Sequence, residues 1–181
     1  MAGTIAKAAD RGYQLIIILA GLTDSLRKQT QNRMQKDIIQ HLEERWYPCT
    51  TEESDFTLNT KLLPIFKGEL KTTILVIKKN VFILKRLLKK IKLESEVNRK
   101  ELTTLIIDDE CDQASLNTKS YREQVSLTNG LIREILQNLN KVTYLGYTAT
   151  PYANILTSQK SVDGKLDLYP NAVSYTHLTL P

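Results

Sequence analysis

The chain has 181 residues, of which 41% are hydrophobic and 25% charged, and its formal net charge is +5. This length and composition are typical of one globular domain with one substantial core. The longest apolar run, Leu15 to Ala20, is too short for a membrane-spanning helix, and Cys49 and Cys111 lack the spacing of a disulfide framework or a zinc site. We therefore expect a cytoplasmic protein with no membrane partner, and the mild basic charge permits contact with nucleic acid.

Helix and strand signals alternate along the chain. Ala2 to Arg11 is rich in alanine and predicts a helix, and Gln14 to Ala20 predicts a fully buried strand. A turn follows, in which Thr23 or Asp24 can cap the next helix. That helix is predicted to run from Ser25 to Arg45.

The pattern weakens after this helix. Proline, glycine and acidic residues between Trp46 and Thr72 predict a loop-rich segment with one short helix. Thr73 to Ile77 then predicts a buried strand, and Val81 to Leu93 a basic helix. Two more strands and the helix between them complete the series: Thr103 to Asp108, Tyr121 to Leu139 and Val142 to Tyr147. The alternation predicts an α/β fold, a three-layer sandwich with a mainly parallel sheet.

A cluster of carboxylates ends the strand predicted at Thr103 to Asp108. An aspartate at the end of a rigid strand can bind Mg²⁺, and a glutamate one residue later can orient a water that attacks a phosphate. These roles fall on Asp109 and Glu110, with Asp108 as a further carboxylate on the metal side. The alternative is a solvated acidic turn without chemistry.

A second polar motif, Thr148-Ala149-Thr150-Pro151, follows the last predicted strand. Small hydroxyl side chains at a strand end can bond to the acidic motif and report the state of a bound nucleotide. The alternative is a capped turn in which Thr150 and Pro151 begin a helix. Both interpretations can hold together.

The two motifs resemble motifs II and III of superfamily-two helicases and translocases, although no Gly-x-x-x-x-Gly-Lys-Ser/Thr phosphate loop occurs in this sequence. Over longer segments the chain resembles the Z-one domain family of endonucleases, found in bacterial and phage-defence settings. Four segments carry this resemblance: Gly12 to Gly21, Leu26 to Arg33, Asp108 to Ser115 and Gly146 to Asn154.

The resemblance implies a partial RecA-like lobe of the P-loop NTPase type over residues 1–172, a fragment of an ATP-dependent DNA translocase or helicase motor with motifs Ia to III. It implies Mg²⁺ and ATP as cofactors of the full-length parent and DNA as a partner. It makes Asp109 and Glu110 catalytic. The residues that it assigns to coupling of hydrolysis to movement are Asp112, Gln113, Thr148 and Thr150.

The family's phosphate loop precedes the segment that matches Ala2 to Tyr13, and its second motor lobe lies beyond residue 172. We therefore expect both to be missing here, together with nuclease or methyltransferase subunits of the parent assembly. Without amides and a lysine to cradle the triphosphate, this fragment is expected to hydrolyse ATP negligibly. A sheet that lacks a strand also predicts a poorly stable chain.

Nucleic-acid contacts are predicted at two places. The resemblance puts a strand-contacting motif at Arg27 and Gln29, and Lys79 and Asn80 lie at the end of a predicted strand. The cations further along the basic helix could also contact nucleic acid, but a solvated face is the commoner explanation of such a helix. Phe82 is the one aromatic residue there, so base stacking is not predicted.

Two alternatives for function stay open. The acidic cluster could be a metal-dependent nuclease centre, although the motif contains no lysine or histidine and Thr148-Ala149-Thr150 would then be unexplained. The chain could instead be a non-catalytic binding or assembly lobe, which a natural start at Met1 would favour.

The last residues, 173–181, follow no pattern set upstream. They resemble the translation of a transposase adapter used in sequencing libraries, and we expect a processing scar there. A natural tail is the alternative.

Overall fold

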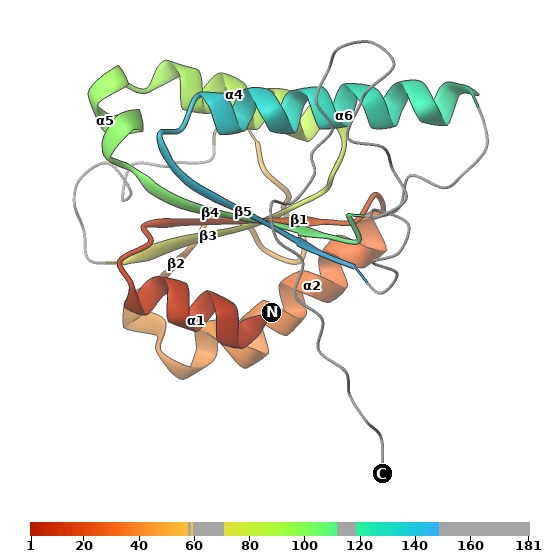
Figure 1. Ribbon diagram of the computed structural model, residues 1–181. Helices are drawn as coiled ribbons and strands as arrows, with labels where there is room; N and C mark the ends of the chain where they lie inside the picture. Colours follow the sequence, from red (N-terminus) through yellow and green to blue (C-terminus); the bar gives the residue numbers. More distant parts are fainter. Residues whose placement is uncertain (58, 60–70, 112–118, 149–181) are drawn as a thin grey trace.

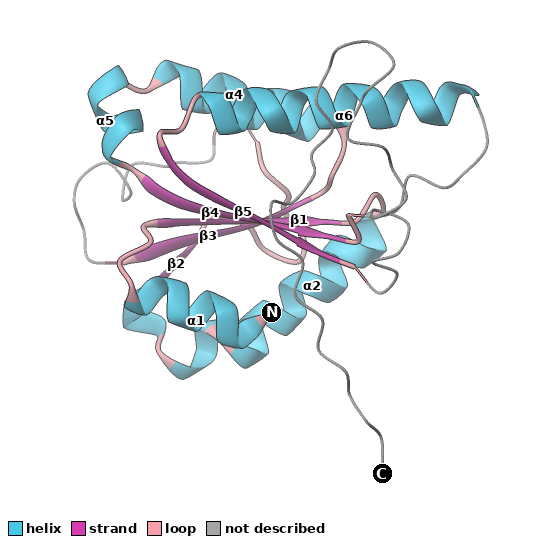
Figure 2. Cartoon of the chain, in the orientation of Figure 1, coloured by secondary structure: helices cyan, strands magenta, loops and turns pink. Residues whose placement is uncertain are grey.

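Five parallel strands form one sheet, and helices cover both of its faces (Figures 1 and 2). The computed structural model describes residues 1–57, 59, 71–111 and 119–148, with the backbone alone for 119–126. The strands lie in the order β2-β3-β1-β4-β5. Their bounds are β1 (Leu15–Ala20), β2 (Trp46–Pro48), β3 (Thr72–Ile77), β4 (Thr103–Asp109) and β5 (Lys141–Tyr147). The predicted α/β class with a parallel sheet is confirmed.

Five α-helices accompany the sheet in the part of the chain that is described. They are α1 (Ala2–Asp10), α2 (Asp24–Asp37), α4 (Val81–Leu93), α5 (Glu96–Glu101) and α6 (Lys119–Gln137). Two single-turn 3₁₀ helices, at Ile39–His41 and Glu43–Arg45, follow α2. None of the described helices has the length and apolar character needed to cross a membrane.

The central strand β1 explains the layered arrangement. All six of its residues are buried, because they pair with β3 on one side and with β4 on the other while helices cover both faces. Its β-branched and leucine side chains suit a strand without a solvent face. Leu15 is in register with Thr73 of β3 and Thr104 of β4.

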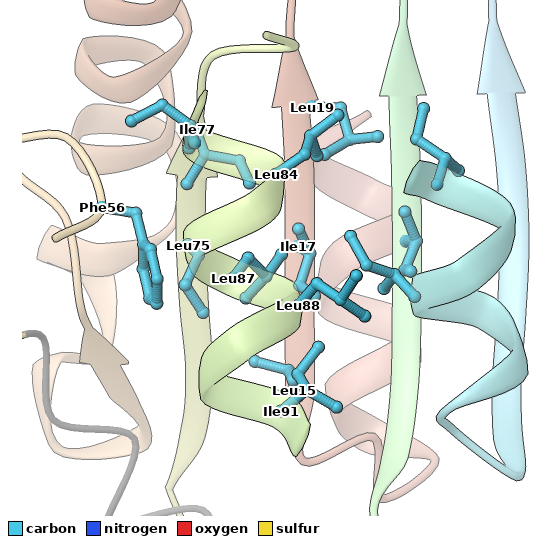
Figure 3. Close-up of a cluster of buried hydrophobic side chains, with 14 of the residues drawn as sticks. Leu15, Ile17, Leu19, Phe56, Leu75, Ile77, Leu84, Leu87, Leu88 and Ile91 are labelled. Atoms are coloured by element: carbon cyan, nitrogen blue, oxygen red, sulfur yellow. The ribbon is translucent and has the colours of Figure 1, made fainter. Parts of the chain in front are cut away.

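The strands divide the interior into two cores, because alternate side chains point to opposite faces of a sheet. On the α4 and α6 face, Leu15, Ile17 and Leu19 of β1 pack against leucines of α4 (Figure 3). On the α1 and α2 face, Ile16 and Ile18 pack against residues of those helices. The same alternation decides which side of the sheet each polar side chain occupies.

The helix predicted from Ser25 to Arg45 is wrong in its second half. Thr23 caps the helix, as expected, by accepting a hydrogen bond from the backbone N–H of Leu26 at 3.3 Å. At its other end α2 stops after Asp37, because Ile38 leaves the helical conformation and both Ile38 and Ile39 turn into the core.

The segment after α2 also differs from the predicted loop. Trp46–Pro48 pairs in parallel with β3 as the edge strand β2, and Trp46 is buried in the core on the α1 and α2 face. Residues 58 and 60–70, which belong to the predicted loop-rich segment, are outside the described residues. The short helix α5 was not predicted; Ser95 caps it by accepting from the N–H of Asn98.

Candidate functional site

The carboxyl ends of the strands lie along one edge of the sheet, which is where open α/β sheets bind ligands. Gly21 follows β1, Lys79 follows β3, Asp108 and Asp109 end β4 with Glu110 directly after it, and Thr148 follows β5. Asp108 is in register with Leu19 of β1 on one side and with Gly146 of β5 on the other. Residues that are distant in the sequence therefore share this edge.

Asp108 is a buried residue of this edge, with 3% of its surface exposed. The ammonium of Lys79 donates to Asp108 Oδ1 at 2.7 Å, and the hydroxyl of Tyr144 donates to Asp108 Oδ2 at 2.7 Å. Burial, with the negative charge of Asp108 beside it, raises the pKa of Tyr144, so this hydroxyl stays a donor. Both oxygens of Asp108 are engaged inside the protein, and its place on the metal side stays a prediction.

Lys79 connects the ends of three strands. Its ammonium, besides the Asp108 contact, donates to the carbonyl oxygens of Asp109 at 3.3 Å and Glu110 at 3.0 Å. Its backbone N–H donates to the carbonyl of Gly21 at 2.9 Å. Lys79 is 7% exposed, as expected of a buried charge with a full set of partners. This position is at odds with the predicted contact between Lys79 and nucleic acid.

The turn after β4 has an unusual backbone. Glu110 has φ +54°, the one positive value among the described non-glycine residues, and this left-handed conformation costs a glutamate roughly 1–2 kcal/mol. The N–H of Cys111 donates to the carbonyl of Tyr147 at 3.1 Å and so fastens the turn to β5. A Cβ at Gly146 would lie 2.9 Å from the sulfur of Cys111, so glycine permits this close approach.

Asp109 and Glu110 are the half-exposed carboxylates of this edge. Asp109 ends β4 in register with Ala20 and Tyr147. A Cβ built on Gly21 would lie 3.5 Å from Glu110 Oε2, so this carboxylate lies beside the loop that follows β1.

The two carboxylates suit only one kind of magnesium site. Within the described ranges no group of three or more histidine, cysteine, aspartate or glutamate residues could hold a metal ion. Mg²⁺ is commonly held by one or two carboxylates together with waters and substrate phosphates. Asp109 and Glu110 fit that hydrated mode and do not form a cage of protein ligands.

Arg27 is also buried, with 1% of its surface exposed. Its guanidinium donates to the carbonyl oxygens of Thr51 at 2.8 Å and Glu52 at 2.5 Å, and to Asp24 Oδ1 at 3.4 Å. It therefore fastens the segment after β2 to the start of α2. These bonds use the donors that the predicted phosphate contact would need.

Asp55 lies in the same cluster of charges, in which Arg27 is buried and Asp24 is 50% exposed. Asp55 Oδ2 is 3.8 Å from Arg27 Nε and 3.8 Å from Lys78 Nζ, and its Oδ1 accepts from the N–H of Phe56. Burial raises the pKa of Asp55, although the two cations oppose this shift. The cluster therefore holds this segment in place without offering an open binding site.

The remaining predicted residues have different positions. Gln29 is exposed on α2, whereas the side chain of Asn80 caps α4 by accepting from the N–H of Ile83 at 2.9 Å. Thr148 is half-exposed at the end of β5, next to the strand that carries the acidic turn. Three residues predicted to couple hydrolysis to movement, and the suspected scar, lie outside the described residues: Asp112, Gln113, Thr150 and 173–181.

Tyr144 is the member of the site that the sequence interpretation missed. It is in register with Ile106, two positions before the pair of Gly146 and Asp108. Side chains two positions apart on neighbouring strands share a face, so a hydroxyl here was a usable signal for a partner of Asp108.

Comparison of the chain with protein-family models, curated proteins and solved structures finds no match.

Proposed function

We propose that this chain is part of a RecA-like motor lobe of the superfamily-two type, from an ATP-dependent DNA translocase or helicase of a defence endonuclease. In this proposal Asp109 binds the magnesium ion of Mg-ATP and Glu110 orients the water that attacks the phosphate. A magnesium ion bound there would neutralise developing charge on the phosphate oxygens. Thr148 would couple the nucleotide state to the neighbouring segments.

One observation carries the proposal: the two half-exposed carboxylates stand on a turn that the fold holds in a strained conformation. Glu110 has a backbone conformation that glycine or asparagine would adopt at lower cost. Lys79 and β5 hold this turn through the carbonyl of Glu110 and the N–H of Cys111. Strain of this kind favours a role for the Glu110 side chain over a solvated acidic turn.

The arrangement of the sheet supports the same proposal. β4 and β5 are parallel neighbours in register, so the acidic turn and Thr148 emerge side by side at one edge. Coupling between a hydrolytic site and a sensing residue requires this proximity. The sequence contains no phosphate-cradling loop, so the chain by itself is expected to turn over ATP negligibly.

Metal binding is the direct test. Mn²⁺ replaces Mg²⁺ as the probe, and its binding to the full chain is followed by electron paramagnetic resonance. We expect weak binding that Asp109→Asn abolishes, while Asp37→Asn, which changes an exposed aspartate of α2, leaves it intact. Unchanged binding in Asp109→Asn would contradict the proposal. Robust magnesium-dependent ATP turnover, abolished by Glu110→Gln, would contradict the expected inactivity of the isolated chain.

The nuclease alternative gains one observation from the structure. Lys79, distant in sequence, brings an ammonium next to the acidic turn and so supplies the lysine that the motif lacks. Its hydrogen bonds to Asp108, Asp109 and Glu110 are all internal, however, which leaves little freedom to act on a water. Plasmid cleavage in Mn²⁺ that Asp109→Ala abolishes would favour the nuclease over the motor.

A further inference from the structure

Positive charge is concentrated on helix α4. This helix carries five cationic residues and no acidic one, and the net charge of the whole chain is also +5. The rest of the chain is therefore balanced between acidic and basic residues. The cationic residues are Lys85, Arg86, Lys89, Lys90 and Lys92.

The cations lie on the outer side of the helix, because its apolar side is used by the core. The buried residues of α4 are Ile83, Leu84, Leu87, Leu88 and Ile91, several of which are seen against the sheet in Figure 3. Lys85, Arg86 and Lys89 are exposed, and no ion pair joins them to any residue in the described ranges. Of the five cations, only Lys92 forms an ion pair with a described residue, Glu134 of α6.

An exposed aromatic residue stands at the start of this basic face. Phe82 is 77% exposed, the highest value among the large hydrophobic side chains that are described. It lies three, four and seven positions before Lys85, Arg86 and Lys89, which is the spacing of one helix face. Phe82 and Lys89 are about 10 Å apart along the axis, the length of roughly three nucleotides at 3.4 Å each.

The chemistry of this face favours one kind of polyanion. An anionic membrane would need a broad apolar face, and that face of α4 is buried against the sheet. A cationic groove or stripe with an aromatic platform is how proteins bind single-stranded nucleic acid, because phosphates meet cations while an unpaired base stacks on the ring. The face begins at the sheet edge that carries the acidic turn, directly after Lys79 and Asn80.

We propose that the outer face of α4, formed by Phe82, Lys85, Arg86 and Lys89, binds single-stranded nucleic acid. Phe82 stacks on an unpaired base, and the three cations contact successive phosphates. The proposal rests on the proposed motor function and supplies the nucleic-acid contacts that the buried Arg27 and Lys79 do not offer.

Binding of a fluorescein-labelled oligothymidylate to the full chain, followed by anisotropy at several salt concentrations, tests this surface. Phe82→Ala is expected to weaken binding about tenfold, because one base then has no ring to stack on. The pair Lys85→Glu and Lys89→Glu is expected to weaken it further and to reduce the salt slope by roughly 0.7 for each phosphate that is no longer neutralised. Lys36→Glu makes half of this charge change, equal to one of the two reversals, on α2 on the opposite face of the sheet, and is expected to leave affinity within about twofold of the unchanged chain.

Three results would overturn the proposal. The first is equal affinity of Phe82→Ala and the unchanged chain, even if charge reversal weakens binding. The second is a duplex of equal length that binds as tightly as the single strand. The third is binding to vesicles with anionic lipids that Phe82→Ala abolishes while the oligonucleotide does not bind. Mn²⁺ binding at Asp109, measured on the same preparations, separates failure of this surface from failure of the proposed motor site.

Discussion

At the scale of single residues, the pair of Lys79 and Asp108 determines the shape of the candidate site. A buried ion pair adds little stability compared with apolar residues of similar volume, but loss of one partner leaves an unpaired charge in the interior. The Lys79 ammonium also holds two carbonyl oxygens of the acidic turn. Its substitution therefore affects both the free energy of unfolding and the position of Glu110.

We expect Lys79→Met to lower the free energy of unfolding by about 3–5 kcal/mol, because the Asp108 carboxylate then stays buried with one hydrogen bond from Tyr144. Asp108→Asn in the same chain should restore part of this loss, since a neutral amide needs no counter-charge. Urea unfolding of the wild type, both single variants and the double variant measures the coupling energy. Additive effects in this cycle would mean that the two side chains do not interact.

At the scale of elements, helix α4 combines an apolar inner face with a side-chain cap. Asn80 accepts from the N–H of Ile83 at 2.9 Å and so satisfies one backbone donor of the first turn. The sequence interpretation gave Asn80 a nucleic-acid contact, for which a phosphate would accept from the amide N–H₂, whereas the cap uses Oδ1 as an acceptor. Substitutions can separate the roles, because the cap needs an acceptor whereas a phosphate needs a donor.

Asn80→Ala is expected to lower the free energy of unfolding by about 1 kcal/mol through loss of the cap. Asn80→Asp keeps an acceptor and places negative charge at a helix N-terminus, so it should retain stability. Thermal unfolding of both variants measures the cap, and oligonucleotide anisotropy measures any phosphate contact. Weaker nucleic-acid binding in Asn80→Asp, with stability unchanged, would favour the phosphate contact over a purely structural cap.

The helices and strands also show which elements could be predicted from the sequence and which could not. Wholly apolar runs such as Leu15 to Ala20 and the amphipathic period of α4 are local signals, and they predicted both elements closely. The strand at Trp46–Pro48 has three residues and a proline, and its strand character comes from pairing with β3. The sequence around Trp46–Pro48 carries no information about this pairing partner, so the strand could not be predicted from it.

The candidate site shows the same limit at the level of side chains. The position of the acidic turn at a strand end followed from the sequence. Arg27 and Lys79 were interpreted as surface cations because charge is visible in a sequence and burial is not. Their partners, carbonyl oxygens of distant segments, are defined only by the folded chain.

At the scale of the whole molecule, the two edges of the sheet are unequal. The β2 edge has three residues and ends at Pro48, which limits pairing with another chain. The β5 edge has seven residues, no proline, and burial that is intermediate over most of its length. Unpaired backbone groups along β5 therefore make this edge the more open one in the described part of the chain.

Hydrogen exchange is expected to reflect this difference. The amides of β5 should exchange faster than those of β1, because among the described strands β1 has a neighbour on each side and β5 has one on a single side. Mass spectrometry of peptides covering Lys141–Tyr147 and Leu15–Ala20 makes the comparison at low protein concentration. Slower exchange of β5 at high concentration, with a rise in mass by light scattering, would indicate pairing between copies. Equal protection of the two strands at low concentration would contradict an open edge.

The order of the strands has a consequence during synthesis of the chain. The ribosome releases β1 before both strands that flank it in the sheet, because β3 and β4 begin only at Thr72 and Thr103. Until then the segment Leu-Ile-Ile-Ile-Leu-Ala has no neighbour to pair with, and such short apolar segments with high β-propensity promote aggregation. Each nascent chain must therefore keep this apolar segment from other chains until β3 and β4 have been translated, a period in which chaperone binding would have its largest effect on yield.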